Sequence, residues 1–440
     1  MKSAFPTVAS ATYSLVRFIT LRLPWLRRIA RSLFDEHRAR QLLAQDSLRE
    51  IKPIAARASA SKGRRVNLLL PGVSDFQLYG GAMTAIEFLQ VVAPDLPKRL
   101  LVTDEIGPFE IAPDRFIGWS RRMLGDEDCD GNCLVGCADR AETTLPIRPD
   151  DVFIATAWWT AILAQQLVRW QTHQYGRAAP LVYLIQDYEP GFYPWSTRYV
   201  LAEQTYRSAV PTIAVFNSTP LRAYFADLGY RFATAFTFEP RLNPVLASEL
   251  ELARNRSRTR QLVIYGRPSV PRNGFPLIIE ALRIWCDTEP DAAGWRIVSV
   301  GEKHPDIALA PGLNLESLGK LDLQSYARLL AESAIGIALM ISPHPSYPPL
   351  EMAAFGLRTI SNRFGGKDLA EQHRNIVSPR DLSAASLAAK LVELTAAFER
   401  HRRGIDTEPW SVADTLFANG SPMFPFKAEL RRCWLDAEAG

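Results

Sequence analysis

Short apolar runs alternate with amphipathic stretches along most of the chain, and this alternation predicts an α/β fold. In the first half, the apolar runs cover residues 64–72, 101–103, 152–157, 181–187 and 212–218. Continuous apolar runs of this kind are typical of strands that are buried on both faces. Amphipathic patterns stand between several of them, and the pattern over 78–92 is opened by Gly80 and Gly81. Such strand–helix alternation favours a parallel, doubly wound sheet.

A second series with the same alternation begins near residue 260. Its strand-like runs cover 261–268, 295–302, 334–342 and 358–362. Its helical patterns cover 274–285, 323–333, 349–357 and 383–401. We therefore predict two Rossmann-like domains, residues 64–250 and 251–404, with parallel doubly wound sheets that face an interdomain cleft. The boundary and hinge are expected near 244–260.

The first 63 residues are predicted to form a basic helical extension. Residues 1–65 hold 14 Lys/Arg and 4 Asp/Glu, a net charge of +10, so the rest of the chain carries −6. In a helix that begins at Trp25, apolar side chains share one face and arginines the other. Such a helix can lie on an anionic membrane surface or dock on the protein itself, and a transit peptide is a third interpretation. Residues 50–65 are interpreted as a linker.

Composition narrows the class of protein. Hydrophobic residues make up 47% and charged residues 22% of the 440 residues, as in a soluble globular protein. No run of 18 uncharged apolar residues occurs, and five cysteines do not make a disulfide framework, so we expect a cytoplasmic protein without a membrane span. Outside the extension the charge leaves no broad basic field, which disfavours nucleic-acid binding.

Polar side chains follow the predicted strands, where an open parallel sheet binds its ligands. Arg267 and Arg272 come after the strand at 261–268, and two guanidiniums beside a helix N-terminus suit a diphosphate. Glu302 follows the next strand, and His344 and Glu351 follow a later one in "SPHPSYPPLEMAAFG". His344, beside prolines, is interpreted either as structural or as an active-site residue.

The first half and the cysteine loop leave further alternatives open. Asp187 and Glu189 follow a strand and would either contact sugar hydroxyls or cap turns. Cys129, Cys133 and Cys137 are spaced four apart, whereas zinc usually requires paired C-x2-C ligands, so no metal is expected. Trp158, Trp159 and Trp195 are interpreted as packing residues, with an aromatic wall for a sugar as the alternative.

The order of these motifs resembles family 4 glycosyltransferases with the GT-B fold. The pieces that carry the resemblance are "YGRPSVPRNGF", "VGE", "LGKLDLQSYARLL", "SPHPSYPPLEMAAFG" and "FGGKDLAE", with "GGAMTAIEFL" in the first domain. "IATAWWTA", "YLIQDYEPGFYPWS" and "FNSTPL" are similar to a subgroup associated with rhamnan and O-antigen assembly. The resemblance covers roughly residues 64–400.

The resemblance implies a metal-independent, retaining-type enzyme that moves rhamnose from dTDP-rhamnose to a cell-surface polysaccharide or lipid-linked glycan. Residues 405–440 would cross back to the first domain, and the enzyme would contact the inner face of the membrane peripherally. Glu351 would bind the ribose. The other donor-binding candidates are Gly80, Gly81, Arg267, Arg272, Glu302, Lys320, Leu321, Tyr326, Ser346 and Tyr347. The candidate catalytic residues are Asp187, Glu189 and His344.

One departure from the family pattern bears on catalysis. Eight residues before Glu351, where the family usually has a second glutamate, this chain has Pro343. The alternative hypothesis is therefore a non-catalytic subunit that binds a nucleotide sugar or a glycan. A dinucleotide oxidoreductase ranks last, because no G-x-G-x-x-G follows the first strand.

Overall fold

The computed structural model describes residues 48–74, 80–106, 116–140, 142–254, 256–405 and 422–435. The chain divides into two compact units, residues 1–52 and 53–440. Of the first unit, a 3-10 turn at Arg49–Ile51 (η1) is described. The expected helical extension up to residue 47 lies outside the described residues, as does 406–421 of the C-terminal segment.

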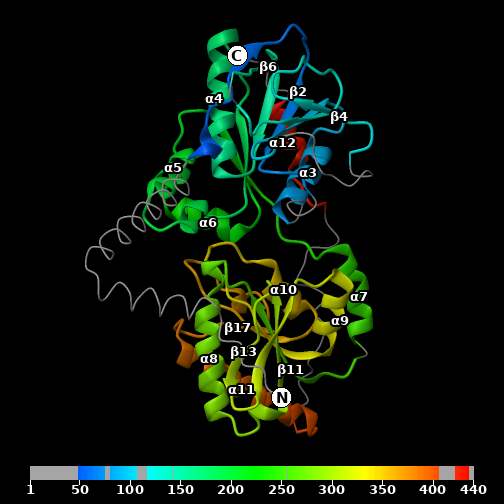
Figure 1. The fold of residues 1–440 in the computed structure, drawn as a ribbon, viewed down its shortest axis with the longest axis vertical. Coiled ribbons are helices and arrows are strands. Elements are labelled where there is room, and N and C mark those ends of the chain that lie inside the picture. The colour runs from blue at the N-terminus through cyan, green and yellow to red at the C-terminus, as the bar shows by residue number, and fades with distance from the viewer. Residues whose placement is uncertain are drawn as a thin grey trace, which may run out of the picture. The chain divides into compact units, whose positions relative to one another are not determined.

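The first sheet has eight parallel strands in the order β10-β9-β8-β7-β2-β3-β5-β4 (Figure 1). Its strands are β2 (Arg65–Leu70), β3 (Lys98–Val102), β4 (Ser120–Met123), β5 (Cys133–Gly136), β7 (Asp151–Ala155), β8 (Leu181–Ile185), β9 (Thr212–Phe216) and β10 (Thr234–Thr237). β2 lies between β7 and β3, so the strand order reverses there. The five runs predicted as strands in this half are all confirmed.

Helices cover both faces of this sheet. On one face, α3 (Gly81–Val92) and α12 (Lys427–Trp434) share an apolar core with β2 and β3. The other face is covered by α4 (Trp158–Tyr175) and α6 (Thr219–Asp227). The 3-10 turn η2 (Glu189–Phe192) and α5 (Thr197–Thr205) continue from the end of β8 and contact each other.

The second sheet has seven strands in the order β13-β14-β12-β11-β15-β16-β17, parallel except for the β13–β14 pair. They are β11 (Thr259–Gly266), β12 (Arg296–Gly301), β13 (Ile307–Ala310), β14 (Leu313–Gly319), β15 (Ser333–Ile337), β16 (Arg358–Ile360) and β17 (Ile376–Val377). β11 lies between β12 and β15, which is the second reversal of strand order. The prediction of two doubly wound α/β sheets is confirmed.

The helices of the second sheet also form two layers. One layer is α8 (Phe275–Thr288) with α11 (Ala384–Arg402), which contact each other. The other layer is α7 (Pro244–Arg254), α9 (Leu323–Glu332) and α10 (Tyr347–Ala354). Short 3-10 turns are η3 (Pro271–Asn273), η4 (Ala292–Gly294) and η5 (Leu369–Glu371).

The connection between the two sheets differs from the expectation. Residues 244–260 were expected to form the boundary, but Pro244–Arg254 are the helix α7, which packs on α9. Its Leu246 is buried in the core of the second sheet. Phe238 is buried in the core of the first sheet, whereas Leu242 belongs to the second, so the chain crosses between them.

The expected linker over 50–65 also contains regular structure. Ala56–Ala58 form the short strand β1, which pairs in parallel with β6 (Leu145–Ile147). Arg57 anchors this strand, because its guanidinium donates hydrogen bonds to the carbonyl oxygens of Thr144, at 2.6 Å, and Asp126, at 2.8 Å.

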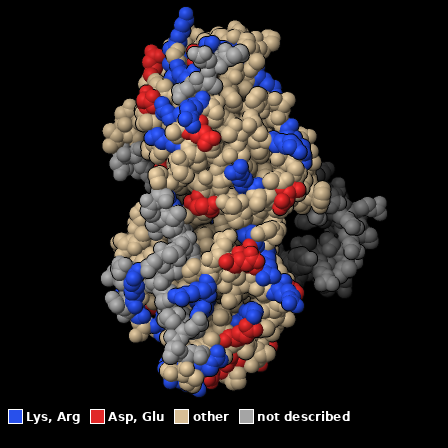
Figure 2. All heavy atoms as spheres, turned by 180° about the vertical axis from the view of Figure 1, so that it is seen from behind, with Lys and Arg blue, Asp and Glu red and all other residues tan. Residues whose placement is uncertain are grey.

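The surface fits the charge balance of the sequence. Figure 2 shows Lys and Arg interspersed with Asp and Glu on the face that it draws, without one broad basic area. Within the ranges that the structure describes, no helix combines the length and the apolar character needed to cross a bilayer.

Candidate functional site

Asp187 joins loops that come from the two sheets. It follows β8, and its carboxylate accepts hydrogen bonds from the backbone N–H of Tyr188, at 2.8 Å, and from the hydroxyl of Ser342, which follows β15. Ser342 also accepts a hydrogen bond from the N–H of His344 at 3.1 Å. The carboxyl ends of both sheets therefore meet at Asp187, which is where parallel sheets bind ligands.

Arg272 lies in η3 after β11 and approaches the same carboxylate. Its Nε lies 3.8 Å from Oδ2 of Asp187, and its guanidinium carbon lies 4.0 Å above the ring centre of Phe192. This Nε is buried and has no hydrogen-bond partner among the described residues. The cation is thus held in place by an aromatic face and a carboxylate, with hydrogen-bonding capacity left unused.

Lys367 was not among the residues predicted from the sequence, yet it lies in this group. Its side chain is buried, and Nζ donates hydrogen bonds to the carbonyl oxygens of Met340, at 2.6 Å, and of His344, at 3.3 Å. Burial lowers its pKa to about 7, against the raising effect of Asp187. The signal in the sequence is a lysine directly after Gly365 and Gly366, at a turn that follows β16.

The proline-rich loop before α10 is held in a strained conformation. Ser346 has φ 69° and ψ 148°, a region that glycine alone normally occupies. Its backbone N–H donates a 3.0 Å hydrogen bond to Nδ1 of His344. Burial lowers the pKa of His344 to about 4, so the ring is neutral near pH 7. Its Nε2 is buried without a hydrogen-bond partner in the described part of the chain.

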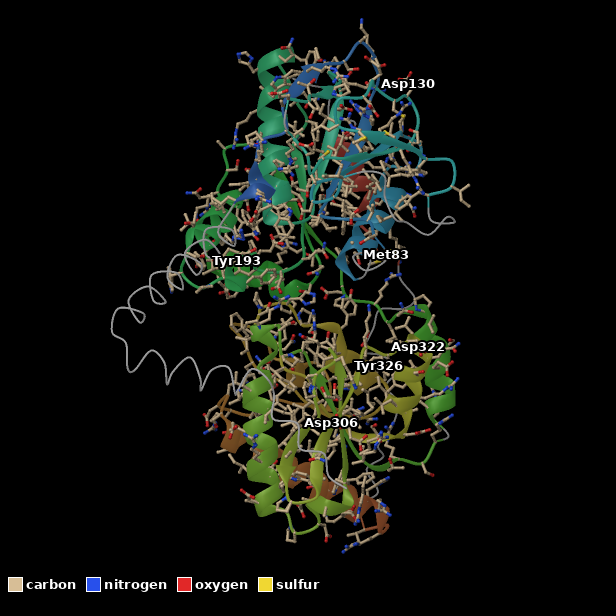
Figure 3. All side chains as sticks on the ribbon, in the orientation of Figure 1. Met83, Asp130, Tyr193, Asp306, Asp322 and Tyr326 are labelled. Carbon is tan, nitrogen blue, oxygen red and sulfur yellow. The ribbon has the colours of Figure 1, made fainter. Side chains whose placement is uncertain are left out.

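Glu351 lies one turn into α10, beside Tyr326 of α9. Burial raises the pKa of Glu351 to about 7, while Tyr326 opposes this shift. Burial and the nearby Glu351 raise the pKa of Tyr326 well above its usual value. The Tyr326 hydroxyl, on the helix where Figure 3 labels it, lies near enough to Glu351 to affect its pKa, but the two groups make no hydrogen bond of normal geometry. A carboxyl group and a hydroxyl without a fixed partner suit a ligand that presents hydroxyls.

The remaining candidates of the second sheet are placed as follows. Half-buried Arg267 lies near Glu302, whose carboxylate accepts hydrogen bonds from the hydroxyl and the backbone N–H of Ser269, at 2.7 and 3.1 Å. These hydrogen bonds lower the pKa of Glu302. Lys320 is exposed, and Leu321 packs against the core. Burial and Glu351 raise the pKa of Tyr347 to about 12.

In the first sheet, Glu189 is the buried acid of η2. Burial raises its pKa to about 8, so it is largely protonated at pH 7, and it accepts a 3.2 Å hydrogen bond from the hydroxyl of Tyr183. Gly80 precedes α3 with φ 47°. A Cβ added to Gly81 would lie 1.8 Å from Oε1 of Gln186, so a side chain there would displace this glutamine.

One expectation about a loop needs correction. Trp195 was interpreted as a packing residue, but it is 90% exposed and only stacks on Tyr199, with ring centres 5.0 Å apart. In the cysteine loop, Cys129 precedes β5 and Cys133 begins it, and all five cysteines of the chain are free. Across the described residues, no cluster of His, Cys, Asp and Glu could hold a metal ion.

We call Asp187, Arg272, Ser342, His344 and Lys367 the carboxyl-end cluster. It contains the cation Arg272, Lys367 with a pKa of about 7, one carboxylate and a neutral imidazole, so its net charge is positive while Lys367 holds its proton. Its unused hydrogen-bonding groups include Nε of Arg272 and Nε2 of His344. Buried donors without partners are costly, and a ligand that offers anionic oxygens would satisfy both donors and charge.

Comparison with known proteins extends this picture. The N-terminal domain model of the family WsaF matches residues 65–219, and its C-terminal domain model matches residues 260–392. An O-antigen biosynthesis protein, RfbC, from Myxococcus xanthus is 31% identical over 215 residues. This match covers 49% of the chain and 16% of the relative, so the chain spans only a small part of that protein's length.

Solved structures match in fold. A sucrose-phosphate synthase from Thermosynechococcus elongatus superposes with a TM-score of 0.51 at 13% identity, over 83% of this chain and 96% of that one. An α,α-trehalose-phosphate synthase from Burkholderia vietnamiensis gives a TM-score of 0.52 at 11% identity, over 84% of this chain and 99% of that one. The two family models together cover more than half of the chain in their expected order. The chain therefore belongs to the WsaF family, among the family 4-like glycosyltransferases with the GT-B fold.

Proposed function

We propose that the protein is a glycosyltransferase that moves rhamnose from dTDP-rhamnose to a growing cell-surface polysaccharide or lipid-linked glycan. The observation that carries this proposal is the carboxyl-end cluster, where buried donors without partners accompany an excess of cations. The O-antigen name of the Myxococcus xanthus relative supports the polysaccharide acceptor. Rhamnose and dTDP rest on the resemblance of "YLIQDYEPGFYPWS" and its neighbours to the rhamnan subgroup.

The candidate residues are expected to have different roles during transfer of the sugar. Arg267 and Arg272 bind the diphosphate and stabilise its growing charge as the bond to the sugar breaks, which supplies positive charge without a metal. Glu351 and Tyr326 bind ribose hydroxyls. The carboxylate of Asp187 accepts a hydrogen bond from a sugar hydroxyl, and the largely protonated Glu189 stays a neutral neighbour in the acceptor side of the site.

Turnover tests this proposal. Purified protein with dTDP-rhamnose and a lipid-linked glycan acceptor should release dTDP and lengthen the acceptor, with UDP-glucose as the matched alternative donor. Arg267→Ala should lower kcat/KM about tenfold to a hundredfold, because a charge-assisted hydrogen bond contributes about 1.5–3 kcal/mol. Arg267→Lys should recover only part of this loss, since an ammonium lacks the bidentate fork.

The alternative, a non-catalytic subunit that binds a nucleotide sugar, is kept because Pro343 stands where the family usually has a glutamate. It predicts that dTDP-rhamnose raises the melting temperature while no dTDP is released, either with or without acceptor. Release of dTDP that requires the intact Arg267 would exclude this alternative.

We also propose that residues 11–34 hold the enzyme on an anionic membrane surface, near a lipid-linked acceptor. The support is the net charge of +10 in residues 1–65 and the arginines that oppose the apolar face. A chain lacking residues 1–47 should float free of liposomes that contain anionic lipid, whereas the full chain should bind them. Equal binding of both chains would contradict the idea.

A further inference from the structure

His344 has a fixed tautomer. Its Nδ1 accepts the N–H of Ser346 at 3.0 Å, so this nitrogen carries the lone pair and not the proton. Burial, together with the nearby Lys367 and Arg272, keeps the ring neutral by lowering its pKa to about 4, against the opposing effect of Asp187. A neutral ring with an unprotonated Nδ1 must carry its proton on Nε2.

The backbone is strained where it fixes this tautomer. Ser346 occupies a conformation that costs a non-glycine residue about 1–3 kcal/mol, and in that conformation its N–H donates to His344. The main chain of His344 is fixed as well, because its N–H donates to Ser342 and its carbonyl accepts from Lys367. The imidazole is therefore oriented before any ligand binds.

The proton on Nε2 has no acceptor. The side chain of His344 is 9% exposed, and Nε2 is buried without a hydrogen-bond partner among the residues that the structure describes. A buried donor left without an acceptor is unfavourable, and native structures rarely keep one without a reason. A ligand oxygen would complete this group.

The charges around His344 indicate which kind of ligand oxygen could accept the hydrogen bond from its Nε2–H. The charged groups that influence the ring are the cations Lys367 and Arg272 and the single carboxylate Asp187, with Tyr347 packed beside it at 6.3 Å between ring centres. The loop leads directly into the N-terminus of α10, where the helix dipole favours negative charge although Pro348 and Pro349 carry no backbone N–H. An anionic oxygen fits this environment better than a sugar hydroxyl.

We propose that Nε2–H of His344 donates a hydrogen bond to a phosphate oxygen of the nucleoside diphosphate. In this role His344 binds the diphosphate and does not transfer a proton. This inference rests on the proposed function, because it requires a nucleoside-diphosphate sugar as the donor. It assigns the strained Ser346 and the buried Lys367 as positioning residues that hold the imidazole ready.

Two isosteric variants test the assignment. In His344→Gln, the amide nitrogen takes the place of Nε2 and keeps the donor. In His344→Asn, the shorter amide can still accept from Ser346 but leaves no donor at the Nε2 position. Isothermal titration with dTDP should show the dissociation constant rising about tenfold to a hundredfold for Asn, the range for one charge-assisted hydrogen bond. Gln should stay within a few-fold of wild type.

Titrations with thymidine, dTDP-rhamnose and UDP distinguish a hydrogen bond to the diphosphate from the alternative explanations. Thymidine affinity should be equal in all three proteins, because thymidine has no phosphate. Unchanged dTDP affinity in His344→Asn would overturn the inference, and so would a loss seen with dTDP-rhamnose but not with dTDP, which would place the oxygen on the sugar. If wild type binds neither dTDP nor UDP, the proposed function itself fails.

A spectroscopic readout is independent of affinity. In protein labelled with 15N-histidine, one of the six histidines should keep a neutral ring with the proton on Nε2 from pH 5.5 to 8, and this signal should shift when dTDP binds. Its assignment follows from its absence in His344→Gln. A His344 ring that titrates near pH 6.5, or that carries its proton on Nδ1, would overturn the inference.

Discussion

Two groups of buried charges, at opposite ends of the strands of the first sheet, differ in how completely their partners satisfy them. At the amino ends of β2, β3 and β7 lies what we call the amino-end network: Arg65, Arg99, Arg148, Asp128 and Asp151. Figure 3 shows Asp130, beside this network, at one end of the sheet, and Met83 and Tyr193 at the other. The carboxyl-end cluster includes Asp187, which follows β8.

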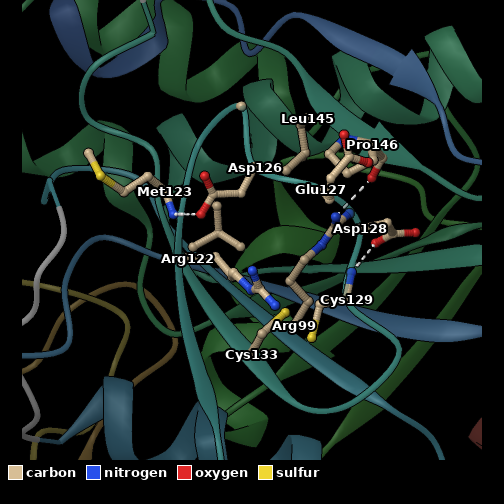
Figure 4. Close-up of a pocket in the computed structure, with 12 residues that line it drawn as sticks. Arg99, Arg122, Met123, Asp126, Glu127, Asp128, Cys129, Cys133, Leu145 and Pro146 are labelled. Carbon is tan, nitrogen blue, oxygen red and sulfur yellow. Dashed lines mark hydrogen bonds between the residues drawn. The ribbon is translucent and has the colours of Figure 1, made fainter.

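In the amino-end network the charges have partners inside the protein. Arg65 forms two hydrogen bonds to Asp151, at 2.8 and 3.0 Å, and Arg148 donates to Asp128 at 2.9 Å. Arg99 donates to Asn67 at 2.6 Å and to the carbonyl of Pro146 at 2.8 Å. Arg99 lines a pocket with Arg122 and Cys129 (Figure 4), and the guanidinium of Arg99 is already hydrogen-bonded within the protein.

This difference distinguishes buried charges that stabilise the fold from buried charges whose unused hydrogen-bonding groups can bind a ligand. A charge with a complete set of partners contributes to stability, and the removal of one partner leaves the others buried and uncompensated. A charged group with unused hydrogen-bonding capacity, such as Arg272, contributes less to stability and can bind a ligand that supplies the missing groups. Substitutions in the amino-end network should therefore lower stability and leave ligand affinity unchanged. Substitutions in the carboxyl-end cluster should lower ligand affinity and leave stability nearly unchanged.

Removing a carboxylate from the amino-end network should have the largest effect. Asp151→Asn leaves Arg65 and Arg99 without their shared partner and should lower the free energy of unfolding by about 3–5 kcal/mol. The dTDP affinity of the folded protein should not change. Urea denaturation with parallel titration checks both. Asp130→Asn is the matched control, because its side chain is 85% exposed, and it should cost less than about 1 kcal/mol. Equal losses would contradict the comparison.

Removing the buried carboxyl group of Glu351, in α10 of the second sheet, should have the opposite effect on the free energy of unfolding. The folded-state pKa of Glu351 is raised to about 7, so the folded protein holds a proton between pH 4.5 and 7 that the unfolded chain has lost. Stability therefore falls as the pH rises through this range and stays low above it. Glu351→Gln should remove the contribution of Glu351 to this fall, while that of Glu189 remains, and should stabilise the ligand-free protein by about 1–3 kcal/mol at pH 8.

Thermal melts from pH 4.5 to 8 check this result. Glu280→Gln removes an exposed carboxylate on α8 and should leave the pH profile as it is in wild type. The same Glu351→Gln protein should bind thymidine more weakly if Glu351 contacts the ribose. A destabilised Glu351→Gln protein at pH 8 would place this residue with the structural charges.

Replacing the planar guanidinium of Arg272 in the carboxyl-end cluster by an ammonium group should lower ligand affinity without changing stability. Arg272→Lys keeps the positive charge but loses the planar group that packs over Phe192, so dTDP affinity should fall about tenfold. The free energy of unfolding should change by less than about 1 kcal/mol, since Nε of Arg272 makes no hydrogen bond to the described residues. Arg256→Lys, in an exposed pair with Glu332, is the control and should alter neither quantity. A large loss of stability in Arg272→Lys would mean that this arginine supports the fold.

The smallest expected effect concerns the strained loop. Ser346→Gly relieves the left-handed conformation and should stabilise the ligand-free protein by up to about 1 kcal/mol, part of the strain being offset by glycine's greater freedom when unfolded. Ser346→Ala removes the hydroxyl and keeps the strain, so it should not raise the melting temperature. If Ser346→Gly and Ser346→Ala have the same melting temperature, the conformation of Ser346 does not destabilise the protein.

Much of the fold could be predicted because its central strands are buried on both faces. Strand β8 is buried at all five positions and shows as an unbroken apolar run, and β2 is buried at all six although Arg65 and Asn67 interrupt its apolar residues. Edge strands lack this signal: β4 reads Ser-Arg-Arg-Met and is largely exposed. Helix α7 was included in the predicted boundary together with the polar residues 255–260 that follow it, and only its packing on α9 shows which core it joins.

The site was predictable where its residues follow recognisable strands. Arg272, His344 and Glu351 could be named because each stands in the loop or helix after an apolar run. Lys367 could not be, because its importance lies in burial and in two backbone carbonyls that no sequence pattern reports. The same holds for the conformation of Ser346, since serine carries no expectation of positive φ.

The packing of α12 on the first sheet has a consequence for synthesis. Phe424, Leu430 and Trp434 complete the core that α3 and β2 begin, and Phe424 meets Phe88 edge to face at 5.1 Å. These side chains are made nearly two hundred residues after β10, on the order of ten to forty seconds later at typical translation speeds. Until then the part of α3 that meets Phe424 and α12 lacks this cover, which favours aggregation of the nascent chain and its binding by chaperones.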